Sequence, residues 1–127
     1  MLAKIHSAAL NGLTVNAIQV EIDSSKGLPS WDIVGLPDTS VKESRERVRT
    51  ALKNQGFDIP PRRIVINLAP ASIKKEGPVF DLAIAIAMLT ATDQVDPESL
   101  KNLVFLGELG LDGSIHPVRG ILPISLA

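Results

Sequence analysis

The chain has 127 residues, of which 45% are hydrophobic and only 3% aromatic, and it contains no cysteine. This length suits one domain with a core of Val, Ile, Leu and Ala, and the lack of cysteine excludes a disulfide scaffold and a thiolate metal site. The longest apolar run, Leu82–Leu89, is far shorter than the ~20 residues that a membrane span needs. The beginning of the chain lacks the pattern of a secretory signal, so we expect a cytoplasmic protein with no membrane partner.

The net charge of −1 conceals a strong asymmetry along the chain. Nine of the thirteen Lys and Arg residues, but only three of the fourteen acidic residues, lie between Lys42 and Lys75, so this segment carries +6. The rest of the chain carries −7. Such a separation indicates either two solvated surfaces or a face that contacts a polyanion, and the sequence leaves both interpretations open.

The first third of the chain predicts three β-strands. Ala3–Leu10 and Thr14–Asp23 are joined by Asn11-Gly12, which is a strong signal for a hairpin turn. The second of these segments alternates in polarity. We expect the side of this strand that carries Ile18, Val20 and Ile22 to face the core. Ser30–Val34, which two Gly-Leu-Pro turns flank, predicts a third short strand.

A helix is predicted from Ser40 to about Asn54. Its first four residues, Ser40-Val41-Lys42-Glu43, match a capping box, in which the serine accepts a hydrogen bond from the third helical N–H. Gly56 is a natural stop. At helical spacing, one face is suited to packing and the next carries cations. The packing face consists of Val41, Ser44, Val48, Ala51 and Leu52, and the cationic stripe of Lys42, Arg45, Arg49 and Lys53.

The middle of the chain predicts a buried strand and a buried helix. Arg63–Asn67 is rich in β-branched residues, which indicates a central strand. Val79–Thr90 is apolar on nearly all sides, so we expect this helix to lie deep in the core. Asp81 lies in its first turn, where a carboxylate suits the helix dipole, and we therefore expect it to cap the helix.

The last part of the chain predicts two further strands. Leu103–Glu108 and Ser114–Pro117 are separated by the turn Leu111-Asp112-Gly113. Glu108 is expected to close the first of these strands. Gly120–Ala127 has the pattern of a helix that has only begun, so we expect the chain to be a fragment of a longer protein.

Several kinds of catalytic chemistry lack their usual residues. No glycine-rich loop is followed by Lys-Ser or Lys-Thr, so a P-loop for a nucleoside triphosphate is not expected. His6 and His116 are the only histidines, and neither has acidic neighbours at metal-ligand spacing. We therefore expect neither a nucleotide cofactor nor a metal in this domain.

Eight motifs, distributed over nearly the whole chain, form a recognisable series. They are Gly27-Leu28-Pro29, Ile33-Val34-Gly35-Leu36-Pro37-Asp38, Val41-Lys42-Glu43-Ser44-Arg45-Glu46-Arg47-Val48-Arg49, Asn67-Leu68-Ala69-Pro70, Lys75-Glu76-Gly77, Phe80-Asp81-Leu82, Leu106-Gly107-Glu108-Leu109 and Pro117-Val118-Arg119-Gly120. The series closely resembles the opening of the magnesium-chelatase-like proteins of the ComM/YifB family. Residues 1–127 are thus identified as a single N-terminal ChlI-like domain.

The resemblance implies the fold of ribosomal protein S5 domain 2, which the Lon protease domain shares. This is an α+β fold with helices packed on a mixed sheet, here C-terminally truncated. Lon-type proteases use a Ser–Lys dyad, and the run that matches their serine motif is Lys75-Glu76-Gly77-Pro78-Val79. Val79 takes the position of the nucleophile and Leu122 that of the lysine, and neither side chain can perform this chemistry. The resemblance therefore implies a domain that is not an enzyme.

The resemblance also implies what lies beyond this chain. An AAA+ module with its own P-loop should follow, so that ATP and Mg²⁺ are cofactors of the parent protein and not of this domain. The parent should form a hexameric ring, in which the domain contacts its own AAA+ module and neighbouring subunits. The ComM branch of the family is associated with DNA branch migration during natural transformation, which makes DNA an expected partner of the full protein.

Three functions remain open for this domain. The first is an accessory domain for DNA binding, ring assembly or both, in which cations would grip phosphates without reading bases. The candidate DNA-binding residues are Lys42, Arg45, Arg49, Lys53, Arg62, Arg63, Lys74 and Lys75. The second is a metal-insertion subunit of the magnesium-chelatase type, although no ligand set for Mg²⁺ or a porphyrin is visible. The third is a diverged Lon-like hydrolase, against which the loss of both dyad positions argues.

Overall fold

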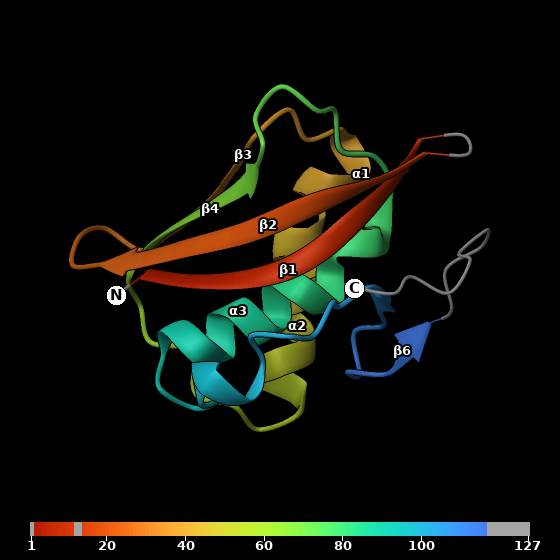
Figure 1. Ribbon diagram of the computed structural model, residues 1–127. Coiled ribbons are helices and arrows are strands. Elements are labelled where there is room, and N and C mark those ends of the chain that lie inside the picture. The colour runs from red at the N-terminus through yellow and green to blue at the C-terminus, as the bar shows by residue number, and fades with distance from the viewer. Residues whose placement is uncertain (1, 12–13, 117–127) are drawn as a thin grey trace.

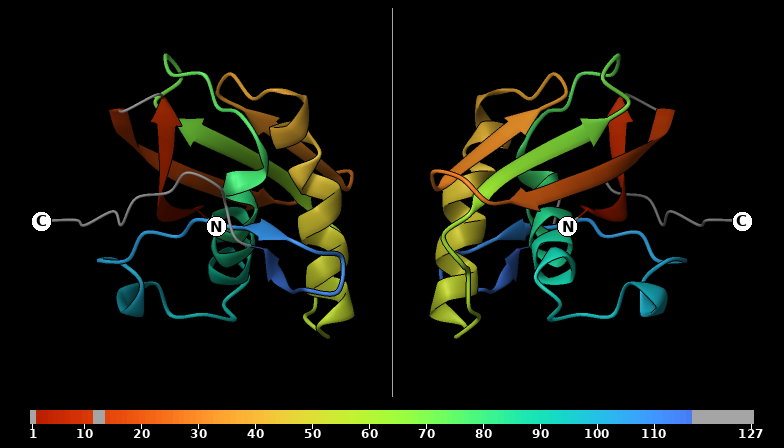
Figure 2. Two further views of the ribbon diagram at one scale, coloured as in Figure 1. Left: turned by 90° about the vertical axis from the view of Figure 1, so that its right-hand side faces the viewer. Right: turned by 90° about the vertical axis from the view of Figure 1, so that its left-hand side faces the viewer.

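The computed structural model describes residues 2–11 and 14–116. It has two layers, a four-stranded sheet and a pair of helices that both lie on the same face of that sheet (Figures 1 and 2). The elements in chain order are β1 (Leu2–Asn11), β2 (Thr14–Ser25), β3 (Ser30–Val34), α1 (Thr39–Lys42), α2 (Ser44–Asn54), β4 (Arg63–Ala69), the 3₁₀ turn η1 (Pro78–Phe80), α3 (Asp81–Ala91), the 3₁₀ turn η2 (Pro97–Ser99), β5 (Glu108–Leu109) and β6 (Ile115–His116). The predicted α+β class with a mixed sheet is confirmed.

The sheet has the strand order β1-β2-β4-β3. β1 pairs with β2 and β2 with β4 in antiparallel fashion, whereas β3 runs parallel to β4. Asn11 pairs with Thr14, which confirms the predicted hairpin, while the two residues of the turn itself lie outside the description. β4 is an interior strand, as its β-branched composition predicts, and β3 forms the edge of the sheet.

The core lies between the sheet and the helix pair. The predicted inward side chains Ile18, Val20 and Ile22 are at most 1% exposed. α3 packs against β1 and β2, and α2 packs against α3 and β3. Nine of the eleven residues of α3 are buried, which confirms the prediction of a deeply placed helix. Its alanines allow the sheet and α2 to approach closely, because a methyl group takes little room.

The predicted helix that starts at Ser40 divides into α1 and α2 at Glu43, and its cap is a different residue from the one expected. The Asp38 carboxylate accepts the Val41 N–H at 2.8 Å, so the capping box assigned to Ser40 is wrong. The other carboxylate oxygen of Asp38 accepts the Gly77 N–H at 3.1 Å. Asp38 is favoured as the cap because one side chain satisfies two backbone donors from distant segments.

The predicted end of the helix at Gly56 is confirmed. Gly56 has a φ of +83°, and the Phe57 N–H donates to the Leu52 carbonyl at 3.0 Å. This bond across the left-handed residue is the mark of a Schellman ending, which satisfies carbonyls that the helix leaves unpaired.

The segment after α3 departs most from its prediction. Leu103–Glu108 is not a continuous strand, since only Val104 bridges to His6 on the edge of β1. The Phe105 N–H donates to the His6 carbonyl at 2.9 Å, and the Ser7 hydroxyl donates to the Phe105 carbonyl at 2.8 Å. Glu108 therefore begins the short strand β5 and does not end a longer one. The predicted strand Ser114–Pro117 is seen as β6, while Pro117 and the predicted helix Gly120–Ala127 lie outside the described residues.

Substitution of Gly35 is expected to be severe. A Cβ at Gly35 would lie 2.3 Å from the Leu68 carbonyl oxygen, and its φ of +104° is strained for any L side chain. Together these effects predict that Gly35→Ala lowers the free energy of unfolding by about 3 kcal/mol or more. Gly56→Ala is the matched control, because its φ is also positive but nothing lies within 4 Å of the new Cβ, so a loss of only about 1 kcal/mol is expected. Urea denaturation measures both losses, and equal values would contradict the steric explanation.

Candidate nucleic-acid interface

The helices α1 and α2 present four cations to solvent. The buried side of α2 consists of Ser44, Val48, Ala51 and Leu52, and Val41 is buried in α1, as the periodicity predicts. Because these side chains pack against the core, the adjacent face of the helices points to solvent. We call that face the basic face and define it by its exposed residues Lys42, Arg45, Arg49 and Lys53.

Two hollows lie where the basic face meets the edge strand β3. The larger, of about 580 Å³, is lined by Lys42 and Arg45 together with Arg63 of β4. The smaller, of about 270 Å³, is lined by Arg45, Arg49 and Trp31. Asp32 borders both hollows, and Arg49 is paired with Glu46 at 3.1 Å on the surface. The structure therefore brings four of the predicted cations together along one edge of the sheet.

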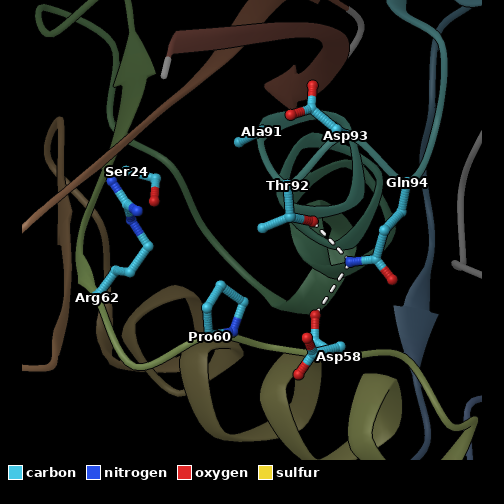
Figure 3. A pocket seen from close by; sticks show the side chains of 8 residues that line it. All are labelled: Ser24, Asp58, Pro60, Arg62, Ala91, Thr92, Asp93 and Gln94. Carbon is cyan, nitrogen blue, oxygen red and sulfur yellow. Dashed lines mark hydrogen bonds between the residues drawn. The ribbon is translucent and has the colours of Figure 1, made fainter.

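The structure does not bring all of the candidate cations together. Arg62 lines a separate pocket beside the end of α3 and shares no hollow with the basic face (Figure 3). Lys74 is exposed in the loop before η1 and lies 3.4 Å from Glu76, so part of its charge is neutralised. Lys53 is exposed in the last turn of α2 but lines neither hollow.

The prediction that Lys75 lies on the surface is wrong, because its side chain is completely buried. Its Nζ donates to the Pro70 carbonyl, and its backbone bridges to Pro37. Burial lowers the pKa of the Lys75 ammonium below its usual value, since a buried charge is poorly solvated. A lysine inside a polar loop gives no periodic signal of burial, so the sequence reading placed it wrongly on the surface.

The prediction that Asp81 caps α3 is also wrong, because its side chain makes no hydrogen bond to the first N–H groups of this helix. It is completely buried and accepts hydrogen bonds from the Ser44 hydroxyl at 2.5 Å and from the Leu109 N–H at 3.1 Å. Arg47 grips the same carboxylate with two nitrogens, Nε at 2.7 Å and a terminal nitrogen at 3.1 Å. That terminal nitrogen also donates to the Ser40 carbonyl at 2.7 Å. One carboxylate thus joins α1, α2, α3 and β5, and we call this set the Asp81 network.

The charge of Arg47 is stabilised by this arrangement. Burial by itself would lower the pKa of the Arg47 guanidinium, but the hydrogen bond and charge of Asp81, with smaller contributions from Glu108 and Glu43, raise it above its usual value. Arg47 is therefore a structural cation, although it lies in the same basic segment as the basic face. Paired partners 34 residues apart leave no local pattern by which the sequence could have revealed them.

The resemblance predicts that Val79 and Leu122 occupy the positions of a Lon-type dyad. Val79 lies in η1, half-buried, and its carbonyl accepts the Gly107 N–H at 2.9 Å. Leu122 lies outside the described residues. In the ranges 2–11 and 14–116, no three His, Asp or Glu side chains form a group suited to holding a metal ion. Over the same ranges, each helix is too short to cross a membrane.

The fold and the motifs define a magnesium-chelatase-like domain of α+β type. The chain belongs to the family described as subunit ChlI of Mg-chelatase, which it matches over residues 20–127.

The chain is also similar to individual proteins along nearly its whole length. The chain is 45% identical over 126 residues to competence protein ComM of Haemophilus influenzae and 46% identical over 121 residues to the uncharacterized protein YifB of Escherichia coli. It is also 44% identical over 126 residues to an uncharacterized protein of Mycobacterium tuberculosis. These alignments cover 99%, 95% and 99% of this chain but only 25%, 24% and 25% of the relatives. The chain thus spans about a quarter of the length of the curated relatives that it matches.

Removal of the Asp81 carboxylate is expected to lower the stability of the fold. Asp81→Ala leaves the Arg47 guanidinium, the Ser44 hydroxyl and the Leu109 N–H without their acceptor. We therefore expect the free energy of unfolding to fall by about 3 kcal/mol. Ser44→Ala removes one donor and leaves the Arg47 pair, with an expected loss of about 1 kcal/mol. Because both substitutions break the same hydrogen bond, the double variant should lose less than the sum. Strict additivity in chemical denaturation would contradict a shared network.

Lys75 predicts a specific dependence of stability on pH. Its pKa is lowered in the folded state from an ordinary value near 10.5, so between these two values the unfolded state binds more protons than the folded state. The free energy of unfolding should therefore rise with pH over the alkaline range below 10.5, and Lys75→Met should abolish this contribution. Urea denaturation of both proteins across this range measures the difference between them, and a difference that stays constant with pH would show that Lys75 is solvated.

Proposed function

We propose that this domain is the non-catalytic N-terminal accessory domain of a ComM/YifB-type AAA+ ATPase, and that its basic face contacts DNA. In this proposal the parent forms a hexameric ring in the cytoplasm and binds ATP and Mg²⁺ in a module outside this chain. The fold is proposed to be that of ribosomal protein S5 domain 2, with Val79 and Leu122 in the positions of a lost Ser–Lys dyad.

The observation that carries the DNA proposal is the gathering of Lys42, Arg45, Arg49 and Arg63 along the β3 edge. Cations that line hollows on a rigid helix can follow a phosphate backbone, and each contact releases condensed counterions. Few aromatic side chains are available for stacking on bases, and Trp31 is half-buried against the core. The surface therefore suits recognition of phosphates and not of base sequence.

A second role for the same face is contact with a neighbouring subunit. The exposed cations of the basic face, Lys42, Arg45, Arg49 and Lys53, would attract an acidic surface on a neighbouring subunit. Metal insertion of the magnesium-chelatase type is the alternative that the family description suggests, but no observation on the described residues favours it.

The test uses the full-length parent protein with Lys42, Arg45 and Arg49 all changed to Ala. Titration of labelled duplex and forked DNA at several salt concentrations should show weaker binding to both. The slope of log affinity against log salt should become shallower by about 2 to 3, because each lost phosphate contact removes about 0.9. Arg47 is left intact, since its loss would disturb the fold.

The control changes Lys4 and Lys101 to Ala, which removes two positive charges from exposed positions that line neither hollow. This variant should keep the wild-type affinity and salt slope. If the basic-face variant binds DNA as the wild type does, the DNA proposal is wrong. Sedimentation of the same variant separates the second role, because a loss of ring assembly with an unchanged salt slope would assign the face to a neighbouring subunit.

A further inference from the structure

The four-stranded sheet has one edge that the described residues leave open. Its β1 edge is covered in part, because the Phe105 N–H donates to the His6 carbonyl at 2.9 Å. At the opposite edge β3 pairs with β4 on one side, and no strand within residues 2–11 and 14–116 pairs with it on the other. Figure 2 shows β3 at the rim of the sheet, next to α2. Such an edge presents backbone donors and acceptors that can pair with another chain.

The register of β3 indicates which of its backbone groups are free. The strand is parallel to β4, and the Ser30 N–H donates to the Arg62 carbonyl at 3.3 Å. In a parallel ladder alternate residues turn both backbone groups toward the neighbouring strand, so the even-numbered residues of β3 face β4. The N–H and C=O groups of Trp31 and Ile33 therefore point away from the sheet, where the described part of the chain offers them no hydrogen-bond partner.

The free edge opens into the two hollows beside the basic face. The smaller hollow is lined by Ser30, Trp31 and Asp32, and the larger one by Asp32, Ile33 and Val34, so all five residues of β3 border a hollow. The facing walls are formed by α1 and α2, with the start of β4 at the larger hollow. A strand edge that faces a helix across an open groove suits the binding of an extended peptide as an added strand.

The charges around this groove define the kind of peptide that fits. Lys42, Arg45 and Arg63 line the larger hollow, and Arg45 and Arg49 line the smaller one. Two acidic side chains also belong to the lining, so four cations stand against two carboxylates. Of these cations, only Arg49 forms an ion pair with a described residue. Acidic side chains on an added strand would pair with the free cations, whereas basic side chains would be repelled.

We propose that the β3 edge binds an acidic peptide in an extended conformation, which adds a strand to the sheet. The peptide backbone pairs with the N–H and C=O groups of Trp31 and Ile33, and acidic side chains on its helix-facing side lie against Arg45 and Arg49. Backbone pairing supplies the affinity, and the cations select the acidic side chains. This inference does not rest on the DNA proposal, because strand pairing uses backbone groups that phosphate binding does not need.

The first experiment follows amide hydrogen exchange by NMR in the 127-residue chain, with the blocked peptide Thr-Glu-Thr-Glu-Thr-Glu-Thr as the probe. Saturating peptide should slow the exchange of the Trp31 and Ile33 amides by at least about tenfold, because both N–H groups gain acceptors. The Asp32 amide, which faces β4, is the internal control and should change little. Unchanged exchange at Trp31 and Ile33 would overturn the proposal. If a short DNA duplex then shifts the basic-face resonances, the face binds phosphates instead.

Two isomeric peptides separate strand pairing from charge attraction. One is N-methylated at two glutamates of the probe and the other at two threonines, so their composition and charge are the same. In an added strand the N–H groups of alternate residues face β3, so one isomer should bind at least about tenfold more weakly than the other. Equal affinities would show that charge alone holds the peptide, and strand addition would be wrong.

Variants of the chain test the charge requirement at exposed positions, where the fold should be retained. Arg45→Gln, which changes the cation shared by both hollows, should weaken peptide binding by about tenfold. Asp32→Asn should strengthen it, because it removes a carboxylate from the lining of both hollows. Lys101→Gln, which lies outside both hollows, is the control and should bind as the wild type does. Wild-type affinity of Arg45→Gln would contradict the selection of acidic side chains.

Discussion

The buried carboxylate of Asp81 is the interaction on which the arrangement of the helices depends. It accepts hydrogen bonds from Ser44, Arg47 and the backbone of Leu109, and Arg47 reaches on to the Ser40 carbonyl. A carboxylate without partners in this place would be strongly unfavourable, so the three helices and β5 are held in the one arrangement that satisfies it. The orientation of α2 follows from this constraint, and the outward direction of the basic face follows from the orientation of α2.

The basic residues between Lys42 and Lys75 lie in different environments. Arg47 serves the interior through its ion pair, and Lys75 is buried with a backbone carbonyl as its partner. Arg62 enters a pocket of its own beside α3. The cations Lys42, Arg45, Arg49 and Arg63 remain exposed on α1, α2 and the start of β4, with Arg49 paired to Glu46. Net charge along the sequence therefore overstates the surface, because charge acts on a partner only where the fold leaves it in solvent.

Most regular elements could be predicted from the sequence, because their signals are local. Alternation fixed the inward side of β2, and helical periodicity fixed the buried side of α2. The end of α2 followed from the single glycine at position 56. Helical spacing grouped Lys42, Arg45, Arg49 and Lys53 in one stripe, whereas the hollows in the structure are lined by Lys42, Arg45, Arg49 and Arg63, because the start of β4 lies beside the helices only after folding.

The sequence by itself determined most of the secondary structure, the apolar core and, through its long motifs, membership of the ChlI family. Only the tertiary structure decided that Asp38 binds the Gly77 N–H across 39 positions, that Asp81 binds Ser44 across 37 positions, and that Lys75 is buried. The physical reason is the distance along the chain over which each interaction acts. Periodicity and turn chemistry act between neighbours in the chain, whereas the environment of a charged side chain is set by groups that meet it only after the sheet and helices have packed.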